Sequence, residues 1–176
     1  MIRIYLIILI LGTFNSSFLV PEKVEKKANK FIMKHYDVKD FEKEIITISE
    51  EFNSMLSLEF GNENFFKIHS QELFLGYGYI GNAKAKSTTF DFLVIFDKDL
   101  IIEKMKVLIY REEYGGEISS KRWLRQFNGI SSSSPELIYN KDIIPISGAT
   151  ISVRSMTIAI NDLIKSIRTL QQLEKL

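Results

Sequence analysis

The chain lacks cysteine entirely, and this absence excludes several kinds of chemistry. Disulfides, thiolate metal sites, cysteine nucleophiles and a lipid-modified N-terminal cysteine all need a residue that is not there. Histidine is almost as scarce, because His35 and His69 are the two that the sequence contains. They lie far apart, without the spacing of metal ligands or the context of a paired nucleophile. We therefore expect neither a metal site nor a catalytic triad.

An excess of charge of either sign is also missing. The 23 basic and 22 acidic residues give a formal net charge of +1, and the two kinds are interleaved along the sequence. Proteins that bind nucleic acid usually carry a clustered basic patch, so we expect no nucleic-acid partner. The length of 176 residues suits a single domain with a substantial core.

No apolar run reaches the length of about 20 residues that spans a bilayer as a helix. Residues 4–11 are wholly apolar, follow the basic start at Arg3, and precede a small, mostly polar stretch at residues 12–17. This order is typical of a secretory signal peptide. We expect residues 1–20 to be a signal peptide or an uncleaved N-terminal anchor; a buried strand of the mature fold stays open as a third interpretation. The first two interpretations export the rest of the chain, to the periplasm or the outer face of the cytoplasmic membrane.

Hydrophobic periodicity predicts helices towards both ends of the chain. After Pro21, residues 22–36 place apolar side chains on one face and lysines opposite. Residues 37–60 are predicted as a second amphipathic helix, because apolar side chains recur there at three- and four-residue steps. From Thr150 a helical apolar stripe runs nearly to the C-terminus. We expect residues 21–64 to form a helical N-terminal segment.

The middle of the chain has the composition of β-strands. Residues 73–80, 90–96 and 101–110 are predicted strands, and the last two form a hairpin around a short aspartate-containing turn. Residues 119–127 are predicted as a short helix. The expected fold class is α+β: an antiparallel, curved sheet packed against the C-terminal helix. The two N-terminal helices either pack on this sheet or dock elsewhere.

Four small residues mark the junction before the C-terminal helix: Ser147, Gly148, Ala149 and Thr150. A helix N-terminus carries unpaired N–H groups and the positive end of the helix dipole, so it favours a phosphate. A hydroxyl held there is well placed to carry a phosphate ester. Serine and threonine are also favoured as N-caps. The four residues alone therefore leave two interpretations open, a phosphate-bearing site and a simple helix cap.

An ordered series of motifs surrounds this junction. The series consists of Gly76-Tyr77-Gly78, the hairpin at residues 90–110, Tyr110-Arg111-Glu112-Glu113-Tyr114-Gly115-Gly116-Glu117, Trp123-Leu124-Arg125-Gln126-Phe127, and residues 146–152. In this order the chain resembles the FMN-binding domain family over roughly residues 73–167, and we expect residues 65–176 to form that domain. The family includes the flavin-carrying periplasmic subunits of the sodium-translocating NADH:quinone reductase and of the Rnf electron-transport complexes, together with small exported relatives.

The resemblance implies a covalently bound flavin. In that family the last threonine of the motif is joined to the phosphate of FMN by a phosphoester bond, and the matching residue here is Thr150. Ser147, Gly148 and Ala149 match the flanking pattern, and Ser152 follows it. A separate magnesium-dependent flavin transferase makes the bond in that family, with FAD as the donor. This enzyme is therefore an expected partner during maturation.

Further residues are expected around the flavin ring, although each also has a purely structural interpretation. Those expected to line the ring are Tyr110, Glu112, Tyr114, Gly115 and Gly116, and Trp123 with Phe127 is expected to flank one of its faces. Gly115-Gly116 is equally typical of a turn. Trp123 and Phe127 are equally typical of a core. Both interpretations stay open for each group.

The sequence thus predicts an exported flavoprotein that carries electrons through an FMN on Thr150, between membrane or periplasmic redox partners. Three alternatives stay open. In the first, the chain is a reductase component with its own small-molecule acceptor. In the second, it binds FMN without a covalent bond. In the third, it is an envelope module in which residues 147–150 merely cap a helix. Whether the protein is an enzyme in its own right is also open.

Overall fold

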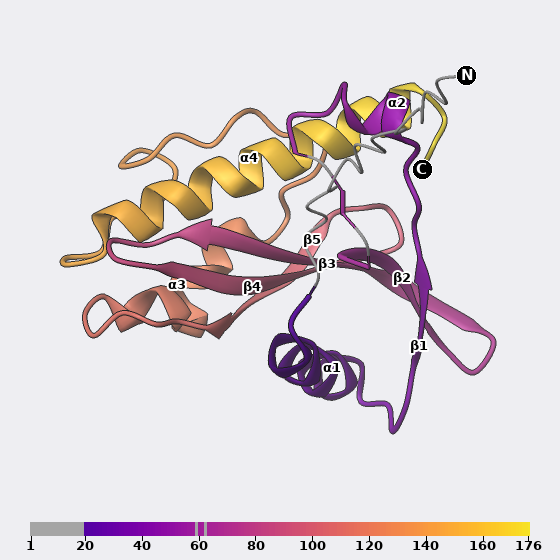
Figure 1. Ribbon diagram of the computed structural model, residues 1–176, viewed down its shortest axis with the longest axis horizontal. Coiled ribbons are helices and arrows are strands. Elements are labelled where there is room, and N and C mark those ends of the chain that lie inside the picture. Colours follow the sequence, from indigo (N-terminus) through magenta and orange to yellow (C-terminus); the bar gives the residue numbers. More distant parts are fainter. Residues whose placement is uncertain (1–19, 59, 62) are drawn as a thin grey trace, which may run out of the picture.

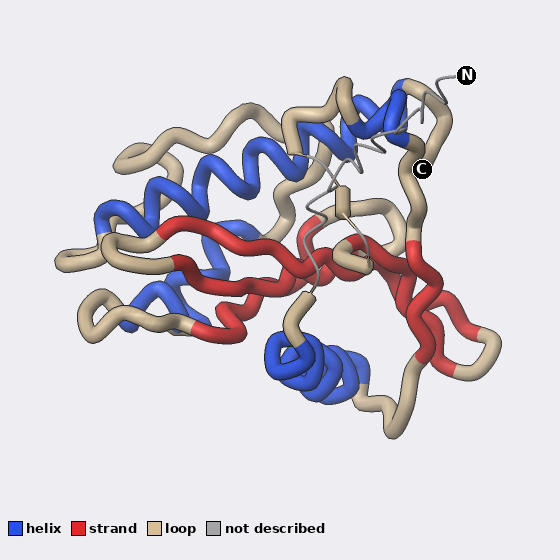
Figure 2. The backbone as a smooth tube through the Cα atoms, viewed as in Figure 1, coloured by secondary structure: helices blue, strands red, loops and turns tan. Residues whose placement is uncertain are grey.

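Five strands form one antiparallel sheet in the computed structural model, which describes residues 20–58, 60–61 and 63–176 (Figures 1 and 2). The strands lie in the order of the sequence, each hydrogen-bonded to the next. They are β1 (Glu42–Ile45), β2 (Phe65–Ser70), β3 (Leu73–Lys84), β4 (Thr89–Phe96) and β5 (Ile102–Ile109). The expected signal peptide or anchor at residues 1–20 lies, apart from residue 20, outside the described residues.

A helix covers each face of this sheet (Figure 1). The C-terminal helix α4 (Thr150–Gln172) packs on one face, and α1 (Glu22–Tyr36) packs on the other. The fold is therefore α+β, as expected. The N-terminal helix α1 belongs to the same packed unit as the sheet, which decides between the two placements that the sequence left open.

Strand β4 is buried on both sides, because successive side chains of a strand point to opposite faces. Phe92 and Val94 face the cluster beneath α4, whereas Leu93 and Ile95 face the cluster beneath α1. Burying each such side chain contributes about 1.5–3 kcal/mol to the free energy of unfolding. The continuous apolar composition of residues 92–96 follows from this position between two helices.

The prediction of a helix over residues 37–60 is wrong. Asp37 adopts a left-handed conformation (φ 54°) that ends α1, and the following chain forms β1 and only a four-residue helix, α2 (Glu50–Asn53). Residues 45–48 are four consecutive β-branched residues, which are stiff at χ1 and favour extended backbone. Pairing of β1 with β2 then extends the sheet by one strand.

The predicted hairpin and the strand before it are confirmed, with β3 extending four residues beyond the predicted end at residue 80. Strand β2 was not predicted. The short helix predicted at residues 119–127 consists of three short turns, η1 (Gly116–Ser119), α3 (Lys121–Leu124) and η2 (Arg125–Phe127). A long loop then leads to α4. No helix in the described ranges combines the length and the apolarity needed to cross a membrane.

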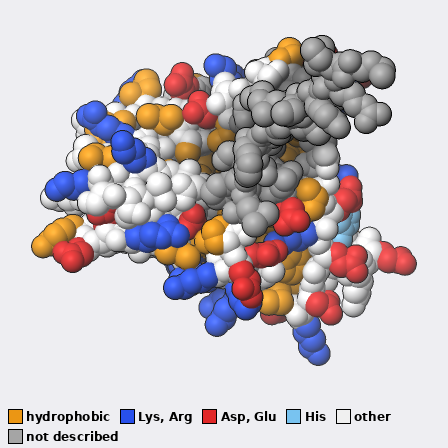
Figure 3. Space-filling model, viewed as in Figure 1, with side chains coloured by type: hydrophobic (Ala, Val, Ile, Leu, Met, Phe, Trp, Pro, Cys, Tyr) orange, Lys and Arg blue, Asp and Glu red, His pale blue; other side chains and the backbone are white. Residues whose placement is uncertain are grey.

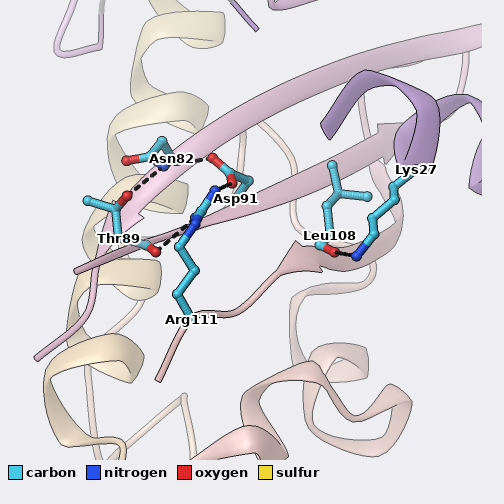
Figure 4. A network of polar contacts seen from close by, with 6 residues as sticks. All are labelled: Lys27, Asn82, Thr89, Asp91, Leu108 and Arg111. Carbon is cyan, nitrogen blue, oxygen red and sulfur yellow. Dashed lines mark hydrogen bonds and ion pairs between the residues drawn. The ribbon is translucent and has the colours of Figure 1, made fainter. Parts of the chain in front are cut away.

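A polar network fastens the chain that leaves β5 to the neighbouring strands (Figure 4). Asp91 on β4 is almost fully buried, and its carboxylate accepts hydrogen bonds from Arg111 Nη2 at 2.6 Å and Asn82 Nδ2 at 2.7 Å. Arg111 Nη1 also donates to the Thr89 carbonyl oxygen at 2.9 Å. The network therefore fixes the residues on either side of Arg111.

We expect Arg111→Ala to lower the free energy of unfolding by about 3 kcal/mol, because it leaves the Asp91 carboxylate buried without its charged partner. The exposed Arg125 is a matched control, and Arg125→Ala should change stability by less than about 0.5 kcal/mol. Urea unfolding of both variants measures the difference. Equal effects of the two substitutions would contradict the assigned role of the network.

Candidate functional site

The N-terminus of α4 is an uncapped helix end. Gly148 has a left-handed conformation (φ 76°) that glycine adopts without strain. Ala149 occupies the N-cap position, where no side chain accepts a hydrogen bond, and Thr150 is the first helical residue. The first backbone N–H groups of a helix have no partner within the helix. The interpretation of Ser147 or Thr150 as a helix cap is therefore wrong, and this end of α4 is available to an anion.

A hollow of about 320 Å³ opens beside this helix end. Its size lies at the lower end of the range for small-molecule sites, about 300–1,000 Å³. The residues that line it are Lys86, Tyr110, Glu112, Tyr114, Gly148, Ala149, Thr150, Ile151 and Ser152. The fold thus brings together three segments that are separate in the sequence, the turn after β3, the chain leaving β5 and the start of α4.

Thr150 presents a free hydroxyl to the hollow. Its side chain is exposed and, within the described part of the chain, makes no hydrogen bond. Ser152 differs, because it is buried and its Oγ lies 3.1 Å from the Tyr110 hydroxyl, with either atom able to donate. The ring of Tyr110 also packs against Phe90, with ring centroids 5.8 Å apart. Tyr110 and Ser152 are therefore held in place at the side of the hollow, while the Thr150 hydroxyl is accessible.

Glu112 holds the turn that carries Lys86. Its carboxylate oxygen Oε1 accepts the backbone N–H of Ser87 at 2.6 Å and that of Thr88 at 3.2 Å. The bond from Ser87 is the main cause that lowers the pKa of Glu112 below its ordinary value, so this side chain is a carboxylate at neutral pH. These bonds hold the backbone next to Lys86, whose exposed side chain lines the hollow and adds its positive charge to that of the helix end.

Gly115 packs against Ala149, which lines the hollow. A Cβ atom at this position would lie 2.4 Å from the Cβ of Ala149, and the φ of Gly115 is 77°. Only glycine therefore lets the chain before η1 approach the N-cap of α4 this closely. A Cβ atom at Gly116 would meet no described atom within 4 Å, so the neighbours of Gly116 impose no such demand.

Besides Gly115, four residues that the sequence predicted at the site do not line the hollow: Ser147, Gly116, Trp123 and Phe127. Trp123 is buried, packs edge-on against Phe127 with centroids 5.4 Å apart, and donates from Nε1 to the Ile144 carbonyl oxygen at 2.8 Å. Gln126 Oε1 accepts the Ile144 N–H at 2.7 Å. These contacts hold the chain just before Ser147 and so fix the approach to α4.

Lys86 and Ile151 line the hollow but were not predicted from the sequence. Ile151 is adjacent to the predicted threonine, and its side chain is exposed. Lys86 carried no sequence signal, since its position depends on how the turn between β3 and β4 folds against Glu112. The predicted residues that do meet at the hollow are Tyr110, Glu112, Tyr114, Gly148, Ala149, Thr150 and Ser152.

Residues 86–165 match the family model of the FMN-binding domain. This part of the chain is an FMN-binding domain. Every residue that lines the hollow falls within the matched range, and the domain thus contains the uncapped end of α4. The helix α1 and strands β1 to β3 precede the match. A comparison with curated proteins gave no match. The protein is a flavin-binding protein, as the motif series implied.

We expect Gly115→Ala to destabilise the protein by more than about 1 kcal/mol and to reduce its flavin content, because the added methyl group displaces Ala149 and the start of α4. Gly116→Ala, at the next position, should leave both stability and flavin content nearly unchanged. Thermal unfolding and the flavin absorbance of purified protein measure the two effects. If both variants lose flavin to the same extent, the contact between Gly115 and Ala149 does not support the site.

Proposed function

We propose that the protein is an exported flavoprotein that carries electrons through one FMN esterified to Thr150. The observation that carries this proposal is the Thr150 hydroxyl, which is exposed, makes no hydrogen bond within the described residues, and lies at an uncapped helix end inside an FMN-binding domain. A threonine with only a structural role would be expected to cap the helix or pair with a neighbour. Thr150 does neither.

The residues around the hollow suit a phosphate bearing a flavin. The N–H groups at the start of α4 and the Lys86 ammonium would hold the phosphate charge, and the helix dipole contributes about 0.3–1 kcal/mol. The rings of Tyr110 and Tyr114 and the exposed side chain of Ile151 offer apolar surface to the isoalloxazine ring. When bound, the flavin supplies the redox chemistry, while the protein supplies position and electrostatics.

Attachment by a flavin transferase would join two existing groups without any redox change. Thr150 Oγ1 loses its proton and forms a bond to the phosphorus of the FMN half of FAD, while the pyrophosphate bond breaks and AMP leaves. The product keeps one negative charge on the phosphate, next to Lys86 and the first N–H groups of α4. A covalent bond also keeps the flavin on a protein exported to a compartment without a free flavin pool.

The pattern of residues 1–20 supports export, and an electron carrier outside the cytoplasm needs membrane or periplasmic proteins as donor and acceptor. The hollow of about 320 Å³ is small, and a bound FMN would itself occupy this space. A carrier whose partners set the direction of electron flow therefore fits it better than a reductase with a second small-molecule substrate.

The decisive test is intact-mass measurement of protein directed to the periplasm and co-expressed with a flavin transferase. We expect a mass increase equal to FMN less one water that survives denaturation, and its complete loss in Thr150→Ala. Ser147→Ala removes a neighbouring hydroxyl outside the hollow and should keep the added mass. An unmodified wild-type mass would overturn covalent attachment. Loss of the adduct in Ser147→Ala, but not in Thr150→Ala, would show that Thr150 is not the residue that carries the flavin.

The contribution of Lys86 is testable without the covalent bond. In the Thr150→Ala background, we expect Lys86→Gln to weaken FMN binding roughly tenfold, as typical for loss of a hydrogen bond to a charged group. Lys84 lies in the same hairpin but outside the hollow, so Lys84→Gln should leave the affinity within about twofold. Quenching of FMN fluorescence gives both dissociation constants. Equal losses would show that only overall charge matters.

A further inference from the structure

A lysine-rich groove runs along the face of the sheet opposite α4. It has a volume of about 600 Å³ and lies between α1 and β5, with α3 at one end. Its lysines are Lys27, Lys30, Lys34, Lys104, Lys106 and Lys121. Phe31, Val107 and Leu108 supply the apolar part of its lining. Although acidic and basic residues are interleaved in the sequence, the fold gathers these six positive charges in one place, and blue side chains cluster beside α1 in Figure 3.

The positive charge of this lysine groove is largely uncompensated. Within the described ranges, none of its six lysines forms an ion pair, and Lys27 Nζ donates instead to the Leu108 carbonyl oxygen at 3.1 Å (Figure 4). The acidic residues of α1, Glu22 and Glu25, pair with lysines outside the groove. One carboxylate lies beside it, that of Glu103, which is 3.2 Å from His35 Nε2. Unpaired lysines around an apolar lining suit a ligand that is both anionic and amphipathic.

We propose that the lysine groove docks the protein on a bilayer that contains anionic phospholipids. Lysine is a strongly hydrated point charge without the planar fork that arginine offers to carboxylates, and protein interfaces are depleted in lysine and enriched in arginine. The lining contains six lysines and no arginine, and its remaining basic residue, His35, lies against Glu103. Lipid phosphates need no fixed bidentate geometry, and each lysine near an anionic bilayer adds to the affinity independently.

The position of α1 in the chain supports a lipid partner over an acidic protein. The apolar run at residues 4–11 is separated from α1 by residues 12–21, which span at most about 35 Å when extended. If that run lies in a bilayer, α1 and its lysines lie within reach of the lipid headgroups. Basic residues on an amphipathic helix next to a membrane segment are typical of electrostatic lipid binding.

Docking through this groove leaves the flavin site accessible. The lysine groove and the hollow at Thr150 share no lining residue, and they belong to the α1 side and the α4 end of the fold. The inference rests on the proposed location at a membrane but not on flavin attachment. Vesicle binding should therefore be the same for the wild-type chain and for Thr150→Ala.

The test is flotation of the full chain with vesicles of phosphatidylcholine alone or of phosphatidylcholine mixed with phosphatidylglycerol. The apolar run at residues 4–11 should bind both kinds of vesicle, so the ratio of the two affinities isolates the contribution of the lysines. We expect the wild-type chain to prefer the anionic vesicles at least tenfold and to lose this preference at high salt, where charge interactions are screened.

The variant Lys30→Gln, Lys34→Gln, Lys104→Gln should reduce the preference by about fivefold per lysine, or up to about a hundredfold for the three. The control Lys39→Gln, Lys98→Gln, Lys141→Gln removes the same charge from exposed positions outside the groove and should keep it. Urea unfolding checks that both variants are folded. Equal wild-type affinity for the two vesicles, or equal losses in the two variants, would overturn the proposal. Loss of the flavin adduct with intact vesicle binding would count against Thr150 attachment alone.

Discussion

The structure depends on the burial of β4 from both sides. A strand with Phe92 and Val94 on one face and Leu93 and Ile95 on the other exposes apolar surface unless each face is covered. The sheet therefore requires α1 as well as α4, although the match to the FMN-binding domain begins only at residue 86. Because α4 is held along its length by core contacts, its first turn is fixed relative to the strands, and so is the side of the hollow that this turn forms.

The residues around the hollow divide into two groups. Some have side chains that face the open space, and others hold these residues in position. Thr150 and Lys86 face the open space, whereas Glu112, Gly115 and Trp123 act through the backbone of their neighbours. This division explains why the motif residues lie so far apart in the sequence. Each supporting residue fixes one of the segments that converge on the start of α4, and Gly115 and Trp123 do so without lining the hollow.

Much of the fold is readable from the sequence, because α1 and α4 have clear helical periodicity, while β3 to β5 are rich in apolar and aromatic residues and are separated by turns. Residues 37–60 misled the prediction since their apolar side chains recur at helical steps by coincidence, while the β-branched run and pairing with β2 decide for a strand. Thr150 was found through its motif. Lys86 and the role of Arg111 were not, because both depend on the geometry of a hairpin that the sequence does not specify.

The strand order has a consequence for when the protein matures. Every strand pairs with its neighbour in the sequence, and short turns join β2 to β3, β3 to β4 and β4 to β5, so these local contacts form early, whereas β1 is separated from β2 by residues 46–64. The helix that carries Thr150 comes after all five strands and returns to the sheet across a long loop. The hollow at Thr150, the proposed acceptor site, is thus complete only when the last element has docked. A transferase that recognises the folded site would act on finished molecules and pass over nascent ones.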